Sequence, residues 1–228
     1  MPKNKLLRYA ELATFKNVLQ PDLDEIKNGF HLKGKWGTEY FKNDNPIVLE
    51  LGCGKGEYTI CLAEKHPNKN FIGIDIKGAR IWKGGKIALE NNMKNVAFIR
   101  TFIDKIECFF GKDEISEIWL TFPDPQKRER RTKKRLTSPG FLSRYEAIIQ
   151  KGGIIHLKTD NVPFFDYTLK MIQENNNKLI WATHDLYGSG KDTDILSIRT
   201  FYEQKYLAEG LPICYMRFTL GSASALLQ

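Results

Sequence analysis

Cysteine is scarce in this sequence, and its few cysteines form no pairs with metal-binding or disulfide spacing. Cys53, Cys61, Cys108 and Cys214 contain no Cys-x-x-Cys motif, and the four histidines are scattered among other residue types. Structural zinc sites and disulfide frameworks both show recognisable ligand or cysteine spacing. We therefore expect no metal site, and free thiols of this kind are typical of a reducing cytosol.

Long hydrophobic runs are also absent. No run approaches the roughly 20 apolar residues of a membrane-spanning helix, and the first residues lead into no apolar signal core. We find neither an internal repeat nor a low-complexity linker. These absences predict a soluble, cytoplasmic protein that does not associate with a membrane.

Positive charge, by contrast, is in excess. The 228 residues carry a formal net charge of +8, with 42% hydrophobic and 27% charged residues, which is ordinary for a globular protein. This length suits one α/β domain, or a domain with a small appendage. The basic balance favours an anionic partner, and nucleic acid rather than a membrane.

From residue 46 onward, short apolar runs alternate with helical patterns. Several runs are continuously hydrophobic, as expected for strands that are covered on both faces. This alternation predicts an α/β fold with a doubly wound, mostly parallel, seven-stranded sheet. Strands are expected at 46–51, 70–75, 95–101, 114–122, 153–159, 178–185 and 212–220, and helices at 56–66, 79–92, 139–150, 163–176 and 198–209.

Residues 1–45 carry no clear motif and are expected to be a lead-in segment to a domain over residues 46–220. Leu12, Phe15, Val18 and Leu19 share one face of a predicted short helix, which Pro21 would end. Residues 29–45 are expected to be extended. Residues 221–228 form a tail without an interpretable pattern.

A glycine loop follows the first predicted strand of the domain. Glu50 near the strand end precedes Gly52, Gly54 and Gly56, and a helix is predicted to follow directly. Glycines allow a sharp turn and close backbone approach to a ligand, while the new helix presents free N–H groups to an anion. A dinucleotide fingerprint has its third glycine one position later, where this chain has Glu57.

The acidic residues around this loop favour S-adenosylmethionine over NAD. The Glu50 carboxylate would repel a pyrophosphate but attract an ammonium and a sulfonium group. Asp75 ends the next predicted strand, about twenty residues further on, where an acid can accept hydrogen bonds from both ribose hydroxyls.

Asp124 lies between two prolines, after an apolar run and before a strongly basic one. The proline rings restrict their own φ angles and the residues before them, which aims the carboxylate. Seven of the nine residues 127–135 are Lys or Arg. Either the carboxylate faces a reaction centre beside a bound polyanion, or this is an ordinary turn followed by a solvated loop; the turn alone favours the second interpretation.

With all these motifs in order, the chain resembles the bacterial tRNA (guanine-N7)-methyltransferase family, whose fold is the Rossmann-like class I methyltransferase fold. Further matches occur at residues 158–160 and 200–203, and the resemblance spans about residues 46–220. It implies an enzyme that transfers a methyl group from S-adenosylmethionine to N7 of a guanine in the variable loop of tRNA. We expect a monomer or a homodimer.

The resemblance also implies roles for individual residues. Glu50, Gly52, Gly54 and Asp75 would hold the cofactor, and Asp124 would be the catalytic acid, placed against both cofactor and guanine. Substrate contacts are expected at Arg128, Asp160, Thr200 and Glu203, and RNA contacts at Arg130, Arg131, Lys133, Lys134 and Arg135. The Thr200 hydroxyl could equally be the N-cap of its helix.

The chain departs from the family pattern at two positions. Phe102 occupies the place of an Asp or Asn near the cofactor adenine, so that adenine either rests against an apolar wall near Ile103 or is contacted by Asp104. Gln126 stands where the family often has Trp. Neither departure affects the three central acidic positions.

Guanine N7 carries a lone pair and no proton, so its methylation needs no general base. Catalysis would rest on alignment and on negative charge near the developing cation, which suits Asp124. Three alternatives remain at this point: a methyltransferase of the same fold that acts on another RNA, a protein or a small molecule, an inactive RNA-binding module, and an NAD-dependent oxidoreductase.

Overall fold

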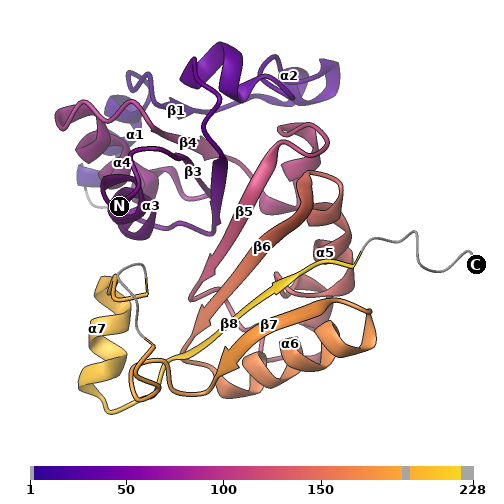
Figure 1. Cartoon of the computed structure of the whole chain (residues 1–228). Helices are drawn as coiled ribbons and strands as arrows, with labels where there is room; N and C mark the ends of the chain where they lie inside the picture. The colour runs from indigo at the N-terminus through magenta and orange to yellow at the C-terminus, as the bar shows by residue number, and fades with distance from the viewer. Residues whose placement is uncertain (1–2, 192–195, 222–228) are drawn as a thin grey trace, which may run out of the picture.

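The computed structural model describes residues 3–191 and 196–221, and its eight strands form one sheet of order β1-β4-β3-β2-β5-β6-β8-β7 (Figure 1). β8 is antiparallel to both of its neighbours, whereas the other strand pairs are parallel. The strands are β1 (Val18–Leu19), β2 (Ile47–Leu51), β3 (Asn70–Asp75), β4 (Val96–Arg100), β5 (Ile115–Thr121), β6 (Ile149–Thr159), β7 (Lys178–Thr183) and β8 (Cys214–Thr219).

Helices cover both faces of the sheet: α1, α3 and α4 gather on one side and α5 and α6 on the other, while α7 lies near the carboxyl ends of β5 and β6 (Figure 1). The α-helices are α1 (Lys3–Leu12), α2 (Leu23–Asn28), α3 (Glu57–Lys65), α4 (Gly78–Glu90), α5 (Pro139–Glu146), α6 (Val162–Glu174) and α7 (Phe201–Ala208). A π-helix at Trp36–Phe41 and 3-10 helices at Ile103–Cys108 and Glu129–Lys134 complete the elements; we call the last one η3.

Two hydrophobic cores lie on the two faces of the sheet. In β2, Ile47, Leu49 and Leu51 pack into one core and Val48 into the other, because successive side chains of a strand point to opposite faces. Every residue of β2 is buried. The predicted doubly wound α/β fold is therefore confirmed, and all seven predicted strands are present.

The N-terminal segment differs from its predicted helix. α1 ends at Leu12, and Val18 and Leu19 form the short edge strand β1 beside Phe98 and Ile99 of β4. Leu12, Phe15 and Val18 still pack into one core, whereas Leu19 packs against the other. The predicted face was therefore right for three of its four residues, and its backbone geometry was wrong. The reason is that β4 would otherwise expose an unpaired edge, and β1 covers it.

Residues 29–45 are not extended as predicted. Turns lead into the π-helix, where Trp36 is completely buried and its indole N–H donates to the Phe109 carbonyl oxygen at 2.9 Å. The helix predicted at 139–150 also ends early, at Glu146. Ile149 already pairs with Ile115 of β5, and the residues after it bulge out of the ladder before pairing resumes.

Within the residues that the structure describes, no helix is both long enough and apolar enough to cross a membrane.

Candidate active site

The loop between β2 and α3 depends on glycine for its backbone conformation. Gly52, Gly54 and Gly56 have φ angles of 81°, 56° and 72°, a region that side chains disfavour. A Cβ atom on Gly56 would also lie 2.7 Å from the Phe98 ring. The loop therefore brings bare backbone to the carboxyl edge of the sheet, where ligands of doubly wound folds bind.

Glu50 is a buried carboxylate directly before this loop, only 4% exposed. The Thr59 backbone N–H donates to one carboxylate oxygen at 2.8 Å, and the Thr59 hydroxyl donates to the same oxygen. The Thr121 hydroxyl donates to the other oxygen at 2.5 Å. Burial raises the pKa of Glu50 to about 7, although these hydrogen bonds favour the charged form. A bound cation would favour ionisation further.

Asp75 at the end of β3 braces the glycine loop. Its two carboxylate oxygens accept hydrogen bonds from the Gly54 N–H at 3.0 Å and the Lys77 N–H at 2.7 Å. A carboxylate has about four acceptor positions, so these bonds leave room for ligand hydroxyls. Asp75 also lines the adjoining cavities.

The turn around Asp124 has an unusual backbone. Phe122 and Gln126, on either side of the Pro-Asp-Pro residues, both have a φ of 48°, which is strained for residues with side chains. One Asp124 carboxylate oxygen accepts the Gln126 N–H at 2.9 Å. Asp124 itself is exposed and lines a cavity.

Three adjoining cavities form one cleft at the carboxyl edge of the sheet, and Gly52 lines all three. The smallest, about 120 Å³, is lined by Glu50, Thr121 and Thr200. We call it the Glu50 cavity. The other two each have Asp75 in their walls. We call the one of about 570 Å³ the Phe102 cavity, and the one of about 730 Å³, which Asp124 lines, the Asp124 cavity.

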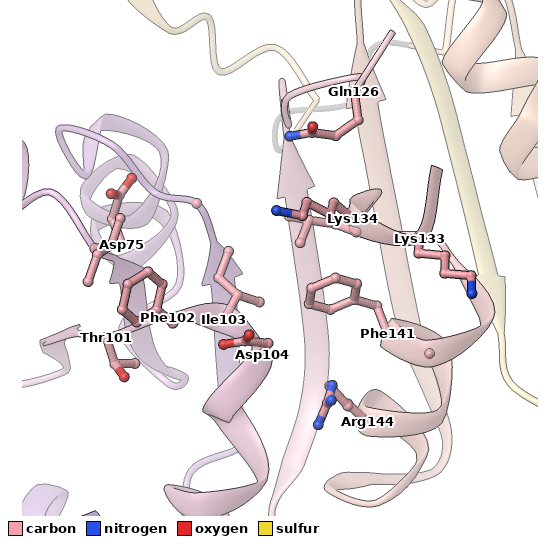
Figure 2. A pocket seen from close by; sticks show the side chains of 14 residues that line it. Asp75, Thr101, Phe102, Ile103, Asp104, Gln126, Lys133, Lys134, Phe141 and Arg144 are labelled. Carbon is pink, nitrogen blue, oxygen red and sulfur yellow. The ribbon is translucent and has the colours of Figure 1, made fainter. Parts of the chain in front are cut away.

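The Phe102 cavity has one aromatic side chain on each wall. Figure 2 shows Asp75, Phe102 and Ile103 on one side and Phe141 and Lys134 on the other. Phe102 is 60% exposed, so its ring is available to a ligand. Phe102 and Ile103 thus give this cavity an apolar wall, and Asp104 lines the same cavity.

The basic run forms η3 at the rim of this cleft. Lys133 and Lys134 line the Phe102 cavity. Arg135 is half-buried and structural: its Nε donates to the Pro125 carbonyl oxygen at 3.1 Å, and its guanidinium lies 4.2 Å from the centre of the Tyr167 ring. The exposed cations of the run are Lys127, Arg128, Arg130, Arg131, Lys133 and Lys134.

Lys158, at the end of β6, is a completely buried cation. Its Nζ lies 2.7 Å from a carboxylate oxygen of Glu203, which is also completely buried, and donates to the carbonyl oxygens of Leu196 at 3.0 Å and Ile198 at 2.9 Å. Burial lowers the pKa of Lys158, and Glu203 opposes this. This pair was not predicted from the sequence, where its one visible signal was a lysine at the end of an apolar strand.

Glu203 therefore does not face the cleft, contrary to the expected substrate contact. Its carboxylate also accepts the Tyr187 hydroxyl at 2.6 Å and the Thr200 N–H at 3.3 Å. In return the Thr200 hydroxyl accepts the Glu203 N–H, which makes Thr200 the N-cap of α7. Asp160 does reach the Asp124 cavity, whereas Arg128 does not line any of the three cavities.

Metal ligation finds no support in residues 3–191 and 196–221, which contain no group of three or more His, Cys, Asp or Glu side chains able to hold an ion. Cys53, within the glycine loop, is buried, and burial together with Glu50 and Asp75 raises the pKa of its thiol well above the usual range. The thiol therefore stays protonated and fills space.

Comparisons with known proteins identify relatives of this chain. A family model described as "Putative methyltransferase" matches residues 44–216. The tRNA (guanine-N(7)-)-methyltransferase of Christiangramia forsetii is 54% identical over 220 residues, which cover 96% of this chain and 98% of that protein.

Solved structures show the same fold at low sequence identity. The 16S rRNA methyltransferase KamB has a TM-score of 0.60 and 15% identity, covering 78% of this chain and 88% of KamB. A geranyl diphosphate C-methyltransferase from Streptomyces coelicolor, in complex with S-adenosyl-L-homocysteine, has a TM-score of 0.53 and 12% identity, covering 87% of this chain and 78% of that one.

The doubly wound sheet with its glycine loop, together with the methyltransferase family model that matches residues 44–216, shows that the chain is a class I methyltransferase. Within that class, the chain belongs to the tRNA (guanine-N7)-methyltransferase family.

We expect the affinity for S-adenosylmethionine to fall as the pH is lowered from about 7.5 to 5.5, because a protonated Glu50 cannot pair with an ammonium group. Calorimetric titration at several pH values measures this. A Glu50→Gln variant should bind about tenfold more weakly at the upper end of this range and lose most of the pH dependence. An unchanged pH dependence in the variant would contradict this role.

The same pKa has an opposite effect on the unliganded fold. Because the folded-state pKa of about 7 exceeds the ordinary 4.5, the contribution of Glu50 to stability is fully present below about pH 4.5 and is lost as the pH rises through about 7. Unliganded Glu50→Gln protein should therefore be at least as stable as the wild type at alkaline pH.

Lys158→Met should lower the free energy of unfolding by about 3–5 kcal/mol, because it leaves the Glu203 carboxylate buried without its cation. Adding Glu203→Gln should restore a substantial part of the loss, since the remaining group is neutral. Urea unfolding measures both changes. Lys170→Met, in an exposed pair with Glu174, is the matched control and should cost about 0.5 kcal/mol or less.

Proposed function

We propose that this chain transfers a methyl group from S-adenosylmethionine to N7 of a guanine in the variable loop of tRNA. Membership of the tRNA (guanine-N7)-methyltransferase family supports the reaction. The structural observation that carries the proposal is the single cleft, which places Glu50, Asp75 and Asp124 around connected cavities beneath a rim of exposed cations.

The Glu50 and Phe102 cavities together suit the two ends of S-adenosylmethionine. Glu50 would pair with the ammonium group, and the free acceptor positions of Asp75 would take the ribose hydroxyls. Adenine would rest on the apolar wall of Phe102 and Ile103, next to Phe141. When bound, this cofactor supplies an electrophilic methyl group on a sulfonium; the geranyl diphosphate methyltransferase of the same fold binds its demethylated form.

Asp124 would act through its charge and not as a base. Guanine N7 has a lone pair ready for attack, so no proton has to be removed. One Asp124 oxygen is held by the Gln126 N–H, which fixes a carboxylate able to accept guanine N–H groups. The same charge, already in place before reaction, stabilises the positive charge that develops on the purine.

The exposed cations of η3 would bind the tRNA backbone. Phosphate contacts of this kind position a nucleic acid without reading its sequence. A tRNA substrate would also place the enzyme in the cytoplasm. A protein or small-molecule substrate would have no use for a basic rim directly beside Asp124. Another RNA would bind this rim in the same way, and family membership favours tRNA over it.

Incubation of the protein with labelled S-adenosylmethionine and unmodified tRNA should yield 7-methylguanosine on nucleoside analysis. Asp124→Ala should lower the rate by about 100-fold or more, with little change in cofactor affinity, because the fixed charge is lost. Asp24→Ala, which removes an exposed carboxylate on α2, is the control. Near-normal turnover by Asp124→Ala would contradict the proposed mechanism, and absence of 7-methylguanosine with the wild type would contradict the function.

Neutralising Arg130 and Arg131 should weaken tRNA binding and flatten its salt dependence, because both cations are exposed on η3. For each phosphate that the variant no longer neutralises, the slope of log K against log salt should fall by about 0.7–0.9. Lys170→Gln with Lys178→Gln removes two exposed charges elsewhere on the molecule and should leave the slope unchanged. Equal slopes for the two double variants would show that η3 does not bind RNA.

A further inference from the structure

Two aromatic rings bound the Asp124 cavity beside its acidic groups. Phe122 lies directly after β5 and before the Pro-Asp-Pro turn, and Tyr206 lies on α7. Their ring centroids are 5.9 Å apart at 38°, and both residues line the cavity together with Asp124 and Asp160. We propose that these two rings form an aromatic wall against which the target guanine stacks. The proposal rests on the proposed function and names the contact that holds its substrate base.

The burial of the two rings separates them from ordinary core aromatics. Trp119 on β5 and Tyr58 on α3, which share one hydrophobic core, are 1% and 0% exposed. Phe122 and Tyr206 are only partly buried and border the Asp124 cavity of about 730 Å³. They therefore present ring surface to a space that is large enough for a purine.

Lys158 contacts both of the segments that carry the two rings. The Phe122 N–H donates to the Lys158 carbonyl oxygen at 2.8 Å, within the left-handed turn that redirects the Phe122 side chain. The Lys158 ammonium group pairs with Glu203 at 2.7 Å, and Glu203 lies one turn before Tyr206 on α7. Lys158 thus links both aromatic elements through its main chain and its side chain.

Guanine could contact the rings with its face and the neighbouring carboxylates with its edge. Aromatic side chains stack on nucleobases of any sequence, while the Asp124 and Asp160 carboxylates accept N–H donors at the guanine edge. Methylation at N7 makes the purine a cation, and an aromatic face attracts a cation more strongly than a neutral ring. The wall would therefore favour the transition state over the ground state, which is the condition for a faster reaction.

Three substitutions of Tyr206 separate stacking from packing. Tyr206→Phe keeps the ring and should retain kcat/KM for tRNA within about twofold. Tyr206→Leu keeps apolar contact with Phe122 without a π face, and Tyr206→Ala removes both. The last two should lower kcat/KM by about 5- to 150-fold, with unchanged affinity for S-adenosylmethionine and folded proteins by circular dichroism. Tyr9→Leu, at a half-buried tyrosine of α1 outside the cleft, is the control.

A second readout detects the stack directly. With 2-aminopurine at the target position of the tRNA, binding to the wild type and to Tyr206→Phe should quench its fluorescence more than binding to Tyr206→Leu. Wild-type kcat/KM in Tyr206→Leu, or equal quenching by all variants, would overturn the aromatic wall while 7-methylguanosine is still formed. If the wild type formed no 7-methylguanosine, the proposed function would fail first and the wall with it.

Discussion

The buried ion pair between Lys158 and Glu203 is the interaction on which the architecture of the cleft depends. Both side chains are completely buried and 2.7 Å apart, so removing either partner would leave an unpaired charge in a low-dielectric interior. The lysine also binds the carbonyl oxygens of Leu196 and Ile198. Lys158 at the end of β6 therefore holds both α7 and the segment that precedes this helix.

Glu50 shows the opposite use of burial. Thr59 and Thr121 donate hydrogen bonds to this buried carboxylate, and desolvation raises its pKa to about 7. Such an environment disfavours the charged form until a cation arrives. In the unliganded fold the charged form of Glu50 is thus disfavoured, and a bound cation would relieve this. The left-handed Phe122 likewise holds local backbone strain beside the cleft.

The elements that could be predicted were those with a strong local pattern. Continuous apolar runs marked the strands because both faces of the sheet are covered, and the glycine loop was recognisable because positive φ angles at Gly52, Gly54 and Gly56 exclude most other residues. The strand at Val18 and Leu19 was misread, since the same apolar spacing serves a helix face or a turn followed by a strand. The helix after Pro139 was predicted too long because pairing between Ile149 and Ile115 is a long-range choice.

By itself, the sequence determined the α/β fold, the ligand edge of the sheet and the acids Glu50, Asp75 and Asp124, because each belongs to a motif whose chemistry is local. Tertiary structure alone decided that Glu203 turns inward to Lys158, that Arg135 supports the turn at Pro125, and that Tyr206 stands beside Phe122. The pairs Lys158/Glu203 and Phe122/Tyr206 are far apart in the chain, and even Arg135 and Pro125 are separated by ten positions. Their partners are chosen by burial and charge pairing across the folded molecule, and no local sequence pattern encodes that choice.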